Sequence, residues 1–333
     1  MTAPAPATTR HDKVPYRGWT TLLALGVPAA IIATTTGLAV SWRHDLPDPI
    51  AVHWGLNGPD GFGSLTTSIV WPAVAGSVVA SLLWALGFFA CRQSFTRRAA
   101  AALSVGFTIL LSGVSIGGLS VQHGVADARD AGSIDGVILV TLLVATAAAG
   151  IVTRLIPGDP PLPTGEPVSP TAARLKLGRG EDASWVRDVT SPGYFLAIVG
   201  VLTIALVALV GLLGGQGWFA LVLGVTIGLS LVAFLHWTVI VDRDGLTVRS
   251  ILRRPCFRIP LNEVEMAEVV EVRPQFGGYG IRSGMAGGAM GVVVRKGPAL
   301  QVHRTGGRVF LVTVDDAATG AALLNTLAGR TRG

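Results

Sequence analysis

The feature that most constrains this chain is a set of long runs without Asp, Glu, Lys or Arg. Five such runs reach the length of a membrane span, at residues 18–42, 61–91, 99–126, 136–153 and 189–241. A spanning helix needs about 20 mostly apolar residues. The last run is too long for one helix, and its central Gly214-Gly215-Gln216-Gly217 favours a chain reversal. The sequence therefore predicts six transmembrane helices, over residues 18–42, 65–91, 99–122, 134–155, 193–213 and 218–240.

Composition agrees with a membrane protein. Half of the 333 residues are hydrophobic and only 14% are charged, and the mean hydropathy is +0.58. These values exclude an ordinary soluble globule, and they exclude a disordered chain, which needs low hydrophobicity and high charge. Two cysteines, Cys91 and Cys256, are too few for a disulfide scaffold. The class that remains is an integral membrane protein with an all-α bundle.

The basic residues predict the orientation of this bundle. Short cytoplasmic loops retain Arg and Lys. Residues 1–17, 92–98 and 154–187 carry many of them, whereas the loops on the other side carry only Arg43 and Arg129. Since six spans place both termini on one side, we expect both in the cytoplasm at the plasma membrane. The preference for Arg over Lys indicates a bacterial source. The net charge of +6 then reflects topology, so the expected partner is the lipid bilayer and not a nucleic acid.

The segments outside the spans predict the domain organisation. Residues 1–17 read as a disordered cytoplasmic tail, followed by a four-helix membrane part over 18–155 with an outer loop over 43–64. Residues 156–192 are predicted to be a Pro-rich cytoplasmic linker, which leads to a two-helix membrane hairpin over 193–240. Four apolar residues of the linker are spaced to touch either the membrane surface or a neighbouring domain: Leu175, Leu177, Trp185 and Val189.

The pattern changes after the sixth span, and residues 241–333 predict a small cytoplasmic α+β domain. WTVIVD and LTVRS form a hairpin through Asp244-Gly245, and GVVVR, PALQVHR and RVFLVTV are further strands. Thr305-Gly306-Gly307 closes a turn, and an amphipathic helix follows with Asp315 or Asp316 as its N-cap. This order resembles bacterial pleckstrin-homology-like domains, which implies a β-barrel with a C-terminal helix. We expect three arginines at one strand connection to contact the membrane surface: Arg249, Arg253 and Arg254.

The outer loop HDLPDPIAVHWGLNGPDGFGS carries the most specific motif. Its pattern rests on Leu46, Pro47, Asp48, Ile50, His53, Asn57, Gly58, Asp60 and Gly61. It resembles the signature of the domain of unknown function 1648 family, over about residues 20–79. Ala51 stands where that family commonly has proline, and Trp54-Gly55-Leu56 alter the spacing before the asparagine. The resemblance implies a multispan bacterial membrane protein. The signature also occurs in SdpI-type proteins, which act in toxin immunity and signalling, and it implies no known reaction.

Three interpretations of this loop stay open. Its prolines restrict φ and its glycines permit turns, so the first and favoured interpretation is a rigid folded loop. The second is a zinc site, because His44, Asp48, His53 and Asp60 lie close in sequence; His53 and Asp60 are its candidate ligands. The third is acid–base catalysis. No spacing fixes two ligands on one helix, and we predict no metal and no cofactor.

Three function classes follow. A binding, sensing or immunity-type regulatory protein would use the rigid outer loop to meet an envelope peptide or protein, and would use the cytoplasmic module to transmit or anchor. A small-solute transporter needs polar groups or broken helices at the midplane, and only Pro28 and Pro72 hint at these. A metal-dependent membrane enzyme would have only the outer loop for its chemistry. We favour the first class and expect no enzyme activity.

Overall fold

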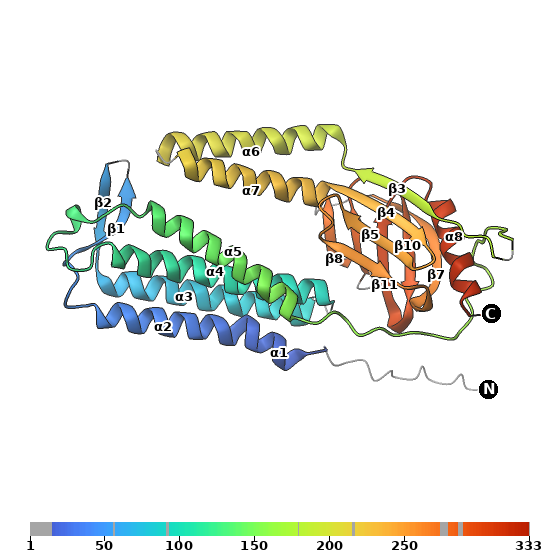
Figure 1. Cartoon of the computed structure of the whole chain (residues 1–333), viewed down its shortest axis with the longest axis horizontal. Helices are drawn as coiled ribbons and strands as arrows, with labels where there is room; N and C mark the ends of the chain where they lie inside the picture. Colours follow the sequence, from blue (N-terminus) through green and yellow to red (C-terminus); the bar gives the residue numbers. More distant parts are fainter. Residues whose placement is uncertain are drawn as a thin grey trace. The chain divides into compact units, whose positions relative to one another are not determined.

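The computed structural model describes residues 15–55, 57–90, 93–178, 180–214, 217–273, 279–285 and 289–332. The chain divides into two compact units (Figure 1). The first comprises residues 1–160 with 213–216, and the second comprises residues 161–212 with 217–333. The first unit is helical apart from one hairpin. The second contains two β-sheets, a C-terminal helix and most of two further apolar helices.

The first unit is built on four helical rods. The first rod joins α1 (Arg17–Thr21), a π-helical turn (Leu22–Gly26) and α2 (Val27–Ser41). The others are α3 (Leu65–Ala85) with a π-helical turn (Leu86–Ala90), α4 (Ser94–Ser120) and α5 (Asp135–Leu155). Within the described residues, four helices are long and apolar enough to cross a membrane: Arg17–Ser41, Leu65–Phe89, Ser94–Ser120 and Asp135–Leu155. They coincide with the first four predicted spans to within a few residues.

The remaining apolar helices are α6 (Gly193–Gly214) and α7 (Gly217–Leu235). The apolar stretch described for them, Gly193–Leu209, is shorter than the four candidate spans. The count of six spans therefore remains a prediction. Helix α7 also ends before the predicted boundary at residue 240, because the chain changes to an extended conformation at His236.

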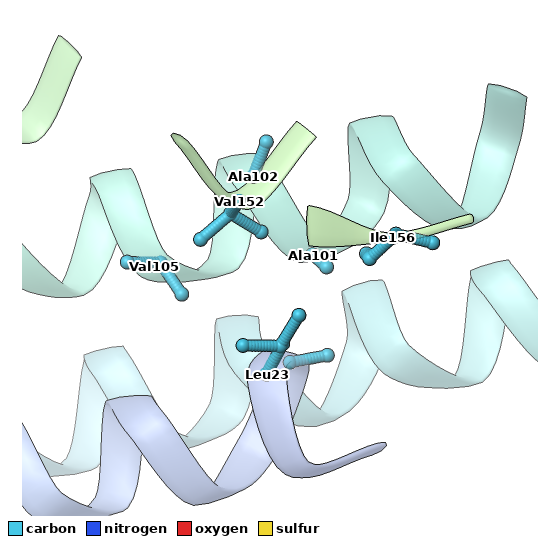
Figure 2. Packing of buried hydrophobic residues seen from close by; sticks show 7 residues of the cluster. Leu23, Ala101, Ala102, Val105, Val152 and Ile156 are labelled. Atoms are coloured by element: carbon cyan, nitrogen blue, oxygen red, sulfur yellow. The ribbon is translucent and has the colours of Figure 1, made fainter. Parts of the chain in front are cut away.

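Helix α4 is the central element of the helical unit, where it contacts α2, α3 and α5. Figure 2 shows one cluster at these contacts, formed by Leu23, Ala101, Ala102, Val105, Val152 and Ile156. Toward α5, α4 presents Gly113 and Gly117, and a Cβ on Gly113 would lie 2.6 Å from Cγ2 of Thr141. These glycines let the two backbones approach closely, as small residues do between membrane helices.

Proline interrupts the backbone hydrogen bonding of α3. Pro72 has no N–H, so the carbonyl of Ser68, four residues earlier, lacks its usual helical donor. The hydroxyl of Ser115 on α4 donates to this carbonyl at 2.8 Å. A side chain of the neighbouring helix therefore supplies the hydrogen bond that proline removed, as apolar surroundings require.

The same arrangement occurs between α2 and α4. Pro28 cannot donate to the carbonyl of Ala24, and the hydroxyl of Ser104 donates to it at 2.7 Å. Ser104 and Ser115 are about three helical turns apart, so they lie on one face of α4. This face holds both proline-containing helices by the same chemistry.

The second unit contains two sheets. The first has the order β3 (Trp185–Thr190), β4 (His236–Asp242), β5 (Gly245–Ser250) and β6 (Cys256–Ile259). The second has the order β7 (Val264–Val272), β10 (Gly297–Arg304), β11 (Arg308–Thr313), β9 (Ala289–Val293) and β8 (Gly280–Met285). Helix α8 (Ala317–Arg330) packs against strands of both. The predicted hairpin at Asp244-Gly245 is confirmed, with a φ of 115° at Gly245.

The expected closed barrel does not form among the described strands. Strands β6 and β7 are consecutive in the chain, yet each is the edge of a different sheet. Pro260 and a 3-10 turn (Leu261–Glu263) separate them. Because proline has no N–H and the turn redirects the chain, the hydrogen-bond ladder is interrupted between the sheets. The structure thus supports a sheet-rich C-terminal region, whose likeness to pleckstrin-homology domains stays an expectation.

The segment expected as a solvated linker, 156–192, contributes to the second unit from residue 161 onward. Thr164 N–H donates to Asn262 O at 2.9 Å, and Asn325 Nδ2 donates to Ala173 O at 3.0 Å. Its last part is strand β3, which pairs with β4 and buries Trp185. Several backbone groups of this segment therefore have hydrogen-bond partners elsewhere in the second unit. Helices α6 and α7 are consequently inserted between two neighbouring strands of one sheet.

Candidate functional site: the cap of the helical unit

The loop that was predicted to be external forms a folded cap, which we define as residues 43–64 together with residues 121–134. Its first part is a hairpin of β1 (Ile50–Gly55) and β2 (Gly58–Gly63), at one end of the helical unit (Figure 1). Gly58 follows Asn57 as the first residue of β2 and has a φ of 111°, which glycine adopts without strain. The favoured expectation of a folded loop agrees with this hairpin, although the strands themselves were not predicted.

The hairpin is fixed to α4 through Gln122. Its buried amide accepts from Ala51 N–H at 2.7 Å and donates to Ala51 O at 2.9 Å. The same Nε2 also donates to Gly118 O at 2.9 Å. The side chain therefore pairs with β1 as a neighbouring strand would, and every polar atom of this buried amide has a partner.

Apolar contacts also hold the hairpin against α2 and α4. Ile50 is 2% exposed and packs with Ala39 and Leu119, and Leu46 adds to this cluster. Trp54 donates from Nε1 to Gly132 O at 3.1 Å. A Cβ added to Gly118 would lie 3.5 Å from the Trp54 ring. Ile50 and Trp54 thus anchor the hairpin to α4 and to residues 121–134 of the cap.

His53 and Asp60 form a pair across the two strands. His53 Nδ1 and Asp60 Oδ1 are 2.5 Å apart, and their side chains are 71% and 55% exposed. Gly55 and Gly61 make room for this pair: a Cβ on Gly61 would lie 2.7 Å from His53 Cβ, and one on Gly55 would collide with the Asp60 carboxylate. The motif spacing therefore places an oriented imidazole on the outer surface of the cap.

This pair is smaller than the metal site considered from the sequence. His44 accepts at Nε2 from Arg43 at 2.9 Å, and Asp48 is exposed near the start of the hairpin. Across the described ranges, no group of three or more His, Cys, Asp or Glu side chains is placed to hold a metal ion. Structural zinc sites use four ligands, and catalytic sites use three protein ligands. His53 and Asp60 alone provide two.

Two apolar side chains of the same hairpin, Val52 and Phe62, are also exposed. The strand register shifts between Ala51 and His53, and this bulge leaves Val52 exposed. Phe62 on β2 is 36% exposed, and the Arg129 guanidinium lies 5.3 Å from its ring centre. The exposed side chains of the cap therefore include Val52, His53, Asp60, Phe62 and Arg129.

The remaining motif residues shape the cap. Pro47 is buried beside Leu46, whereas Asn57 is exposed at the turn. Gly58 and Gly61 are half-buried. Gln122, Trp54 and Arg129 were missed by the sequence analysis. A lone glutamine at the end of an apolar run was the only available signal for Gln122.

The arginines expected at a membrane surface lie in the second unit. Arg249 is on β5, and Arg253 and Arg254 are in the turn before β6. All three are exposed. They form a set of their own at a strand connection, separate from the cap residues in the chain.

Comparison with known proteins finds a family model that matches part of the chain. The family model described as "Domain of unknown function (DUF1648)" matches residues 30–76. No curated protein and no solved structure matches the chain. The matched segment runs from α2 through the β1–β2 hairpin into α3, so it contains the first part of the cap. The apolar helices and this match together fit a membrane protein that carries a domain of unknown function.

Proposed function

We propose that this chain is a multi-pass protein of the bacterial plasma membrane that binds an envelope peptide or protein through the cap and acts as a sensor or an immunity-type regulator. The observation that carries the proposal is the contrast between the two sides of the hairpin. Its inner side is fixed by buried contacts to Gln122 and Ile50. Its other side leaves Val52 and Phe62 exposed on the same hairpin that carries the His53–Asp60 hydrogen bond.

Such a surface suits recognition for physical reasons. Covering exposed apolar side chains with a partner removes them from water, which makes the free energy of binding more favourable. A hairpin that is already ordered loses little conformational entropy on binding. Asp60, His53 and Arg129 add polar groups that select the partner's charge. The proposal assigns no reaction to the cap.

The orientation also supports an external cap. Helix α1 begins at Arg17, α4 begins near Arg98 and α5 ends near Arg154. These helix ends are opposite the end at which α2 and α3 are joined by the cap. Since basic residues stay cytoplasmic, the cap is expected outside and both termini inside.

The transporter alternative has one observation in its favour. A cavity of about 10 Å³ lies between α2, α3 and α4, lined in part by Thr35, Thr36, Ser112 and Ser115. This volume is roughly that of one water molecule. A transported solute would require these helices to separate, so binding at the cap remains the better-supported function.

Treatment with a chelator distinguishes the proposed binding function from the alternative of a metal-dependent enzyme. If His53 and Asp60 act only as a surface pair, a chelator leaves the melting temperature of the purified protein unchanged. A chelator-sensitive melt that zinc restores, and that His53→Ala abolishes, would favour a metal-dependent enzyme instead.

Site-specific crosslinking tests binding directly. Phe62 is replaced by p-benzoylphenylalanine, and intact cells are irradiated. We expect a discrete adduct with an envelope peptide or protein, because this ring position lies on the outer surface of the cap. The matched control places the same group at Leu143, which is 61% exposed on the candidate span α5.

Two outcomes decide the result. An adduct at position 62 that is absent at 143, and that weakens when Asp60→Asn removes the charge, supports recognition by the cap. If position 62 gives no adduct, or only the products seen at 143, the cap is not a binding surface.

A further inference from the structure

Helices α6 and α7 join the first sheet at one end of its strands. Strands β3 and β4 are paired, with Thr190 opposite His236. The chain passes from β3 into α6 after two residues, and from α7 into β4 directly. Ser191 N–H donates to Leu235 O at 3.1 Å, which joins the two crossing points. Both helices therefore leave the sheet side by side at this end of the strands.

The turn between β5 and β6 lies at the same end of the strands. Ile251 N–H donates to the carbonyl of His236, the first residue after α7, at 3.2 Å. Within the turn, Ser250 N–H donates to Pro255 O at 3.0 Å, and Arg253 N–H donates to Ser250 O at 2.8 Å. Leu252 N–H donates to Ser250 Oγ at 3.2 Å. The turn is thus held in a fixed shape next to the base of α7.

The side chains of this turn are unusual for a sheet connection. Ile251 is 59% exposed and Leu252 is 47% exposed, although the strands beside them bury Val248 and Ile259. Arg249, Arg253 and Arg254 are exposed on either side of the pair. Two aliphatic side chains with cationic neighbours are typical of a surface that enters the boundary between lipid headgroups and acyl chains.

We propose that the β5–β6 turn inserts Ile251 and Leu252 into the membrane monolayer that the α6–α7 hairpin enters, while its three arginines bind anionic headgroups. This inference extends the proposed multi-pass function and rests on the predicted six-span topology in one respect, namely that the hairpin enters the membrane. A bilayer is the partner because the turn is hydrogen-bonded to His236, the residue that follows α7. At that level, headgroups and acyl chains are the surroundings of the emerging helix.

Fluorescence quenching in the full chain tests the insertion. Cys91→Ala and Cys256→Ala provide a cysteine-free background, and Ile251→Cys is labelled with a polarity-sensitive dye. The protein is reconstituted into phosphatidylglycerol–phosphatidylcholine vesicles, with or without brominated acyl chains. We expect the label at 251 to be quenched by brominated lipid and protected from iodide.

The matched control is Val269→Cys on β7 of the other sheet, since this residue is also aliphatic and 46% exposed. Its label should respond to iodide and not to brominated lipid. Replacing Arg249, Arg253 and Arg254 by Gln should reduce the lipid quenching at 251 in phosphatidylglycerol-containing vesicles. In vesicles of neutral lipid alone, the same replacements should change it little.

A third label separates this inference from its premise. Leu202→Cys lies within α6. If the label at 202 is quenched by brominated lipid and the label at 251 behaves like that at 269, the insertion is wrong and the hairpin premise holds. If the label at 202 is not quenched, the premise itself fails. Protection of 251 from iodide without lipid quenching would mean that a protein covers the turn, and this also overturns the proposal.

Discussion

At the scale of single residues, Gln122 joins the hairpin of the cap to α4. Its amide satisfies both backbone groups of Ala51 inside a buried contact. In Gln122→Leu these groups and the Gly118 carbonyl lose their partner, and each unsatisfied buried group costs roughly 1–3 kcal/mol. We expect faster hydrogen exchange across residues 50–63 and a lower melting temperature.

The control for Gln122 is His53→Ala, because His53 lies on the exposed side of the same hairpin. Exposed substitutions usually change stability by less than about 0.5 kcal/mol. Equal exchange rates in the two variants would show that Gln122 does not hold the cap in place.

A second residue-scale prediction concerns Asp159, which follows α5. Burial alone would raise its pKa, but the backbone N–H of Ser94 and the guanidinium of Arg97 outweigh burial and lower the pKa below the ordinary aspartate value. Arg97 is fully buried and lies 2.8 Å from the carboxylate. A depressed pKa contributes stability above the unfolded-state pKa of about 3.9. This contribution is lost as pH falls through the folded-state pKa.

We therefore expect the melting temperature of the natural chain to fall as the pH decreases below about 4. Asp159→Asn should be less stable at pH 7, since Arg97 loses its carboxylate, and its stability should depend less on pH in the acidic range. Asp127→Asn is the control, because Asp127 pairs with Arg129 at an exposed site. An unchanged acid dependence in Asp159→Asn would rule out this carboxylate as its source.

At the scale of elements, α4 compensates for proline in its neighbours. In Ser115→Ala the Ser68 carbonyl loses the donor that replaces the missing N–H of Pro72. Hydrogen bonds between membrane helices contribute roughly 1 kcal/mol, so we expect a loss of that order in detergent unfolding. Pro72→Ala restores a backbone donor. In that background, Ser115→Ala should be nearly neutral.

The control for this double-mutant cycle is Ser81→Ala on α3. Its hydroxyl donates to the Ser77 carbonyl of its own helix at 2.8 Å, and that carbonyl also has a helical N–H available. A Ser115→Ala effect that is the same with and without Pro72 would exclude the proposed compensation.

Element-scale features differ in how far the sequence could predict them. Four helices followed from charge-free runs, because a local pattern determines them. Strand β3 was not predicted, since its partner β4 follows an insertion of two helices. The donors for Ala24 and Ser68 lie 80 and 47 residues away in the chain. No local pattern connects residues at such distances.

The candidate site divides in the same way. His53, Asp60 and Gly58 were predicted from a motif within one loop, and the two halves of this loop pair as β1 and β2. Gln122 lies 71 residues from Ala51, and a single amide carries no periodicity that would assign it to a hairpin. Contacts within the loop were thus accessible from sequence, whereas its anchor required the packed structure.

At the scale of the whole molecule, the predicted membrane topology can be tested by locating each connection on one side of the membrane. Reporters fused after Arg97, Arg174 and Gly333 should read cytoplasmic, and reporters within 44–62 or 124–132 should read external. Cys256 then faces a reducing compartment and should stay a free thiol. Cys91 shares this prediction but lies outside the described residues. An external C-terminus would contradict the arrangement.

The same reporters cannot distinguish four spans from six, because a hairpin that enters and returns leaves the C-terminus on its original side. The end of α6 decides between them. In a cysteine-free chain, Gly214→Cys at this end should react with a membrane-impermeant maleimide in intact cells if α6 and α7 cross the membrane. Asn57→Cys on the cap is the external control, and Lys176→Cys is the cytoplasmic control. If Gly214→Cys reacts only after permeabilisation, as Lys176→Cys should, then α6 and α7 do not span and the bundle has four transmembrane helices.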